Sequence, residues 1–115
     1  MAAGPAKFVH EGEAIDYTPG ADTLVGAVVV QAEMVGVAVA PIKANQLGSL
    51  AVSGVFDFPK AGGAGSAIPA GTNTYWDAGA QNATKNAAAG VNKLIGKAVK
   101  TTVDADTVVR VRLLQ

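Results

Sequence analysis

The sequence predicts an all-β protein, built as a small, partly open β-barrel or as a β-clip-like sandwich. Two observations lead to this fold class. Short apolar runs rich in β-branched residues begin at glycines and end at polar or proline turns. Elsewhere, apolar and polar residues alternate with the period of two that a half-buried strand requires. With 115 residues, we expect one β domain over residues 7–115, preceded by a flexible arm over residues 1–6.

The first 41 residues contain three expected extended segments. Residues 7–17 alternate loosely between apolar and polar side chains. A Thr-Pro-Gly turn at 18–20 follows, in which proline presets one backbone angle and glycine accepts a positive φ. The β-branched runs at 28–30 and 37–39 each follow a glycine, and Pro41 ends the second run.

Residues 49–60 give the clearest strand signal. Alternate residues fall on one face, and Gly54 interrupts the pattern, which predicts a bulge or a sharp bend there. Pro59 ends the segment. Residues 61–67 are too rich in glycine for a stable element, so we expect a mobile surface loop. The expected inner face of 49–60 consists of Leu50, Val52, Gly54, Phe56 and Phe58.

The C-terminal half contains two further strand signals and one ambiguous segment. Residues 74–76 form a short β-prone run, and 108–113 alternate as a half-buried closing strand. In 87–100 the apolar residues have helical spacing, but the internal Gly90 and Gly96 each disfavour a helix by about 1 kcal/mol relative to alanine. We favour a strand there and leave open one short helix within 80–92.

Composition and charge exclude several classes of partner. Nine lysines and arginines balance nine aspartates and glutamates, so no basic surface is expected for nucleic acid or an anionic membrane. No uncharged apolar run has membrane-spanning length, and the N-terminus lacks the apolar segment of an export signal. The chain has no cysteine and only six aromatic residues. Much of the apolar composition is alanine and glycine, whose small side chains bury little apolar area in a core. Additional burial in an oligomer interface is therefore expected.

No arrangement of residues indicates catalysis, a metal or a cofactor. His10 is the single histidine, and its acidic neighbours are more typical of a solvated segment than of a metal site. No serine lies in a nucleophile elbow. The glycines at 62–65 lack the following lysine and hydroxyl of a phosphate-binding loop. We therefore expect no enzyme, no cofactor and no small-molecule substrate.

The aromatic residues and the arm are the candidate interface. Adjacent residues of a strand point to opposite faces, so we expect one ring of Tyr75 and Trp76 in the core and the other outside, where aromatics favour interfaces. The alternative is that these two and Phe8 are all core residues. The arm runs directly into a strand-like segment. The candidate interface residues are Lys7, Phe8, Val9, Tyr75 and Trp76.

Eight short segments form a pattern that extends from about residue 7 to the C-terminus. They are FVHEG (8–12), AIDYT (14–18), GVA (36–38), GSLAV (48–52), GVFDFPK (54–60), YWD (75–77), IGKA (95–98) and VRVRL (109–113). Their order and spacing resemble the capsid cement or decoration proteins of tailed phages. The resemblance implies a β-rich virion protein of a phage or prophage, made in the host cytoplasm without an export signal. It implies that the major capsid protein is the partner and that the outside of the shell is the location.

Related decoration proteins often form trimers at local three-fold positions, and by analogy a homotrimer is expected. Residues 2–9 are expected to become ordered on binding and to add a strand to a shell subunit. An alternative function is a free-standing binding module, for example for a saccharide, in which Tyr75 or Trp76 stacks on the ligand.

Overall fold

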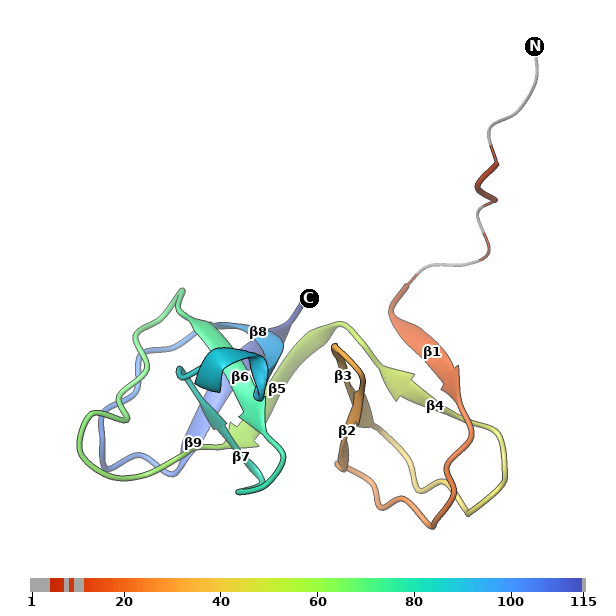
Figure 1. Ribbon diagram of the computed structural model, residues 1–115, viewed down its shortest axis with the longest axis horizontal. Helices are drawn as coiled ribbons and strands as arrows, with labels where there is room; N and C mark the ends of the chain where they lie inside the picture. Colours follow the sequence, from red (N-terminus) through yellow and green to blue (C-terminus); the bar gives the residue numbers. More distant parts are fainter. Residues whose placement is uncertain (1–4, 8, 10–11, 115) are drawn as a thin grey trace.

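The computed structural model describes residues 5–7, 9 and 12–114. It contains two antiparallel sheets, which lie beside each other along the longest axis of the molecule (Figure 1). The predicted all-β class is confirmed: the described residues form nine strands and one short 3-10 turn, with no α-helix. None of the described residues belongs to a helix long and apolar enough to cross a bilayer.

The N-terminal sheet has four strands in the order β1-β4-β3-β2. Its central strands are β4 and β3, so β1 and β2 are the free edges. A two-residue turn joins β2 to β3, and Ala32 in this turn has a positive φ of 54°. The strands are β1 (Ala14–Tyr17), β2 (Val28–Gln31), β3 (Met34–Ala38) and β4 (Gly48–Ala51).

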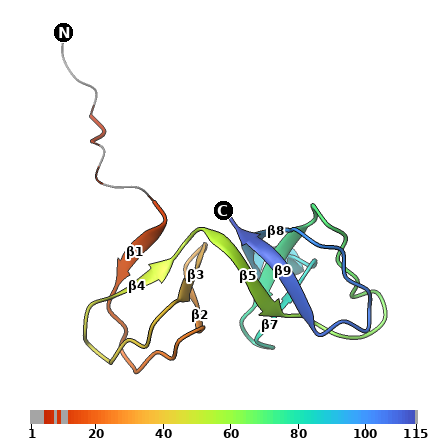
Figure 2. The same cartoon turned by 180° about the vertical axis from the view of Figure 1, so that it is seen from behind.

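The C-terminal sheet has five strands in the order β5-β9-β8-β6-β7. Lys60, directly after β5, forms a parallel bridge to Ala83 of β7. The sheet therefore curls until its two edges meet at one point, but the barrel stays open elsewhere (Figure 2). The strands are β5 (Gly54–Pro59), β6 (Asn73–Asp77), β7 (Asn82–Thr84), β8 (Lys93–Ala98) and β9 (Val108–Leu113).

The predicted bend at Gly54 is confirmed, and it has a larger effect than a bulge. Gly54 has a φ of 113°, a backbone conformation that side-chain-bearing residues rarely adopt. The chain leaves β4 in the first sheet and enters β5 in the second across this residue. Residues 49–60 are therefore two strands of two sheets, and Pro59 ends the second as expected.

The ambiguous segment 87–100 is mainly a strand. Residues 93–98 form β8 and pair with both β6 and β9, because Ile95 and Ala98 complete the core of this sheet. The short helix left open within 80–92 is a single 3-10 turn at Ala88–Gly90, in which Ala88 and Ala89 both have positive φ.

The main core lies inside the curled five-stranded sheet. Phe58, Ile68, Ile95, Val109 and Val111 are buried there, each exposing at most 2% of its surface. Val35 and Val37 of β3 belong to the same cluster, so the first sheet closes one side of the core of the second.

A smaller core lies on the opposite face of the four-stranded sheet. Leu50 and Ile42 are buried there beside Ala38, and the partly buried Ile15 and Tyr17 of β1 pack against them. The predicted single inner face of 49–60 is therefore divided, because Leu50 belongs to this smaller core whereas Phe58 belongs to the main core.

Gly96 is a position where the five-stranded sheet accepts no side chain. It is buried on β8, opposite Leu113 of β9. A Cβ atom added to Gly96 would overlap the carbonyl oxygen of Arg112 and approach the backbone nitrogen of Leu114. Close packing of β8 and β9 therefore depends on glycine here.

We expect Gly96→Ala to lower the free energy of unfolding by about 3 kcal/mol, because backbone must move to admit the methyl group. Gly62→Ala is the matched control, since no heavy atom lies within 4 Å of its added Cβ. The control should stay within about 1 kcal/mol of the unmodified chain. Urea unfolding followed by Trp76 fluorescence measures both, and equal stability of the two variants would contradict the close-packing argument.

Candidate functional site

The N-terminal arm leads to a free sheet edge. Lys7 and Val9 are exposed and have no regular secondary structure, and Val9 exposes 83% of its surface. Phe8 lies outside the described residues. This segment precedes β1, which lies at the end of the molecule away from the five-stranded sheet (Figure 1).

Strand β1 has backbone groups available for pairing on its outer edge. The amide of Val52 donates to the carbonyl of Glu13 at 2.9 Å, and the register continues with Ile15 opposite Leu50. In an antiparallel ladder the bonded residues alternate. The N–H and C=O groups of Ala14 and Asp16 therefore point away from β4, toward a position that an added strand could occupy.

The structure separates the two aromatic candidates as their adjacency predicted. Trp76 is buried, with 3% exposed, and its ring lies 6.0 Å from that of Phe58, at 56°. Its indole N–H is buried and has no acceptor in the part of the chain that the structure describes. Tyr75 is half-buried on the other face of β6, opposite Thr84 and Leu94. Trp76 therefore offers no stacking surface for a saccharide, which weakens that alternative.

The candidate interface residues do not form one surface. Lys7 and Val9 precede the edge of the four-stranded sheet, whereas Tyr75 lies on an inner strand of the five-stranded sheet. The contact roles of all five candidate residues remain predictions.

The apolar loop tip, a second exposed feature not singled out from the sequence, consists of Leu24 and Val25 on one loop and Leu47 on the loop bonded to it. These side chains are 76%, 62% and 70% exposed. Reciprocal backbone hydrogen bonds between Thr23 and Ile42, 2.7 and 2.9 Å long, hold the two loops together. Aliphatic residues on ordered loops are typical of contact surfaces. In the sequence, the only sign of this surface is the adjacent apolar pair Leu24-Val25 between turns that contain Gly20 and Gly26.

The glycine-rich loop 61–67 has no regular structure, as predicted, and hydrogen bonds connect it to Lys60 and Asp104. The ammonium of Lys60 is buried and donates to the carbonyl of Ala61 at 2.9 Å and to the hydroxyl of Ser66 at 3.0 Å. The carboxylate of Asp104 accepts from the amides of Ala67 at 2.8 Å and Gly65 at 3.2 Å. Lys60 and Ser66 thus have structural roles, consistent with the absence of a phosphate-binding motif.

The backbone amides of Ala67 and Gly65 hold the pKa of Asp104 below its ordinary value of 3.8. A carboxyl group whose pKa is lower in the folded state stabilises the fold above its unfolded pKa, and this stabilisation disappears as the pH falls through the folded value.

We expect Asp104→Asn to destabilise the protein at pH 7, because the charge that the two amides favour is lost. The difference from the unmodified chain should shrink progressively as the pH falls below 3.8. Thermal unfolding of both proteins between pH 7 and the acid limit of folding measures this. A difference that does not change with pH would contradict the assigned role.

The outer face of the five-stranded sheet has an ion pair. The guanidinium of Arg110 on β9 donates to both carboxylate oxygens of Asp57 on β5, at 2.9 and 3.2 Å. This contact lowers the pKa of Asp57 and raises that of Arg110. Both side chains are about half exposed, so the pair contributes little to stability. The Asp57 carboxylate balances the positive charge of Arg110 on this face.

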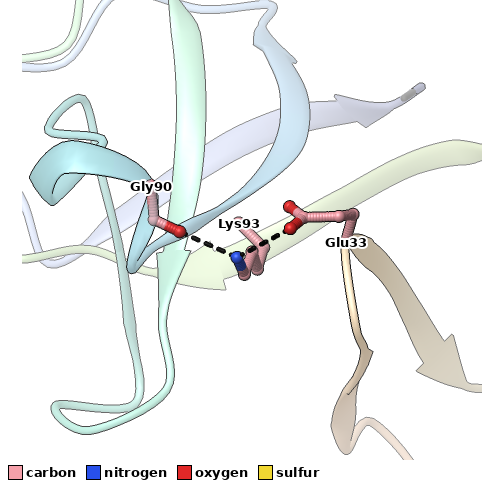
Figure 3. Close-up of polar contacts among 3 residues, drawn as sticks. All are labelled: Glu33, Gly90 and Lys93. Carbon is pink, nitrogen blue, oxygen red and sulfur yellow. Dashed lines mark hydrogen bonds and ion pairs between the residues drawn. The ribbon is translucent and has the colours of Figure 1, made fainter.

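A second ion pair joins the two sheets. The ammonium of Lys93 on β8 donates to the Glu33 carboxylate at 3.1 Å and to the carbonyl of Gly90 at 2.7 Å (Figure 3). Glu33 lies in the turn between β2 and β3 and is 86% exposed. This contact adds to the apolar packing of Val35 and Val37 against the five-stranded sheet.

The described residues contain no group of three or more histidine, cysteine or acidic side chains that could hold a metal ion. His10 and Glu11 lie outside these residues.

Comparison with known proteins decides the family. The family of phage cement proteins matches residues 9–113, nearly the whole chain. The chain belongs to the phage cement protein family. No curated protein matches the sequence, and no solved structure matches the fold. The resemblance inferred from the eight segments is confirmed.

Membership of the cement family supports a structural, capsid-stabilising role and an association with a phage capsid in the virion. It implies a non-enzymatic protein.

Proposed function

We propose that this cement protein binds the outside of the assembled head shell of a tailed phage or prophage and stabilises it, with the major capsid protein as its partner. The family match over residues 9–113 is the observation that supports this function most directly. The exposed arm and the free edge of β1 add a physical means of attachment.

The stabilisation follows from mass action. A protein that binds the assembled shell but not the free subunits shifts assembly toward the shell by RT ln(1 + [L]/Kd) at each site. At a free concentration of 100 times Kd this amounts to about 2.7 kcal/mol per site. Repetition over many sites makes the effect on the shell large even when each contact is weak.

Attachment proceeds by strand addition. Residues 5–9 lead into β1, whose outer edge leaves the backbone groups of Ala14 and Asp16 available. In our proposal the arm becomes ordered on the shell and pairs with a strand of a capsid subunit. Three copies then sit around each local three-fold position, as related decoration proteins often do.

Deletion of residues 2–7 should reduce co-sedimentation of the protein with assembled shells. Val9→Pro should have the same effect within an arm of full length, because proline cannot donate a backbone hydrogen bond to an added strand. Val9→Thr is the matched control, since it keeps both the N–H and the β-branched shape. If both the deletion and the proline variant bind as well as the unmodified chain, strand addition by the arm is wrong.

Addition of the protein should raise the temperature at which purified shells dissociate, and the shift should grow with the free concentration as the binding relation requires. Unassembled capsid subunits serve as the reference. A shell whose dissociation temperature is unchanged at saturating protein would contradict the stabilising role itself.

A further inference from the structure

A single short connection joins the two sheets. Strands β1 to β4 belong to the four-stranded sheet and β5 to β9 to the five-stranded sheet, so the chain crosses between the sheets once. Only Val52 and Ser53 separate β4 from β5. Figures 1 and 2 show this connection as a sharp arch. The position of one sheet relative to the other therefore depends on a few backbone angles.

The arch requires glycine at position 54 for its backbone angle and not for space. The φ of 113° at Gly54 lies in a region that glycine adopts readily and other residues rarely adopt. A Cβ atom added to Gly54 would contact only ring carbons of Phe56, the nearest at 3.4 Å. A methyl group there would thus meet an ordinary contact, and its cost would come from the backbone.

The sequence around the arch also suits a straight strand. The apolar alternation of residues 50–58 continues through Gly54 without a change of phase. An extended backbone at Gly54 would therefore join β4 and β5 into one strand with a single apolar face. The two sheets of such an open copy would lie apart. Val35 and Val37, which are buried in the core of the five-stranded sheet, would then be exposed to water at a cost in free energy.

A second copy offers every contact that an open copy loses. Val35 and Val37 of one copy can pack in the five-stranded core of the other, as they do within a closed copy. The carboxylate of Glu33 can likewise bind the ammonium of Lys93 on the second copy in place of its own (Figure 3). Two open copies that exchange their four-stranded sheets therefore keep the contacts between sheets and change only the hinge.

We propose that Gly54 is a hinge and that the protein has a second state, a domain-swapped dimer. In this dimer residues 48–59 form one continuous strand, and each four-stranded sheet packs against the five-stranded sheet of the other copy. Dilute protein favours the closed copy, because association costs translational and rotational freedom. High concentration favours exchange. Copies side by side on a shell are at high local concentration, and this last step alone rests on the proposed function.

Substitution at the hinge shifts the balance between the two states. Gly54→Ala strains the closed copy, because alanine disfavours a positive φ, but it leaves the extended strand of the dimer unstrained. The Kd of dimerisation should therefore fall at least about tenfold. Gly63→Ala is the matched control, since Gly63 also has a positive φ, 98°, and open space around an added Cβ, but lies in the loop 61–67. The control should remain as monomeric as the unmodified chain.

Size-exclusion chromatography with light scattering measures the dimerisation. Each protein is held between micromolar concentrations and about 1 mM in urea near its unfolding midpoint, which lets the sheets separate, and the urea is then removed. The unmodified protein should give a dimer at the upper end of this range. The dimer should persist on dilution, because closing again requires the sheets to part. Circular dichroism checks that each variant is folded.

Cross-linking identifies the exchange. The chain has no cysteine, so Glu33→Cys and Lys93→Cys each introduce a unique thiol on one side of the contact between the sheets. The two variants are mixed, taken through the urea step at about 1 mM and treated with a short bifunctional maleimide. A swapped dimer of one copy of each brings the two thiols together, so a covalent dimer should appear on a denaturing gel. Lys43→Cys mixed with Lys85→Cys is the matched control, because both positions are exposed and neither belongs to the core that joins the sheets.

Two outcomes overturn the inference: monomers alone over the whole range for the unmodified chain and a folded Gly54→Ala variant, or a dimer whose cross-linking does not exceed that of the control. If Gly54→Ala does not fold, the mixed cysteine variants decide, because both keep Gly54. Co-sedimentation with shells separates this result from the proposed function. A protein that binds shells but never exchanges leaves the function standing and removes the hinge, whereas a swapped dimer that ignores shells does the reverse.

Discussion

Burial of strand β3 on both faces is the constraint on which the rest of the structure depends. Val35 and Val37 point into the core of the five-stranded sheet, and Ala38 points into the smaller core with Leu50. Gly36 between them leaves room for Leu50, whose side chain would lie about 3.0 Å from an added Cβ. One strand thus joins two sheets that are otherwise connected by the bend at Gly54 and the exposed Lys93–Glu33 contact.

This arrangement explains how a chain with few aromatic residues buries enough apolar area to fold. The four-stranded sheet alone encloses little core, since the smaller cluster contains only three buried residues. Packing of β3 against the five-stranded sheet buries more apolar area than the two sheets would bury apart. The outer surfaces are then free for contacts: an edge strand next to the arm at one end, the apolar loop tip, and a basic and apolar face on the other sheet.

Such a distribution suits a protein that acts within an assembly. A cement protein must contact a shell, and in our proposals it also contacts other copies of itself. Strong attachment at any one surface is unnecessary when the same contact repeats over a shell.

Patterns with a local physical cause were predictable from the sequence. The bend at Gly54, the end of the strand at Pro59 and the burial of Trp76 but not Tyr75 follow from properties of single residues and their neighbours. The family resemblance was also available, because it depends on order and spacing. The hydrogen bonds that anchor the loop 61–67 were not predictable, since they come from Asp104, 37 residues beyond Ala67.

The sequence by itself thus determined the fold class, the strands with clear alternation, the bend, the family and the absence of catalytic motifs. Only the tertiary structure decided that the bend at Gly54 divides the chain between two sheets and that both faces of β3 are buried. The same holds for the pairing of Lys97 with Arg112. These features arise from pairing between distant segments. The total charge of zero does not reveal that acidic residues predominate in the segment of the four-stranded sheet and basic residues in that of the five-stranded sheet.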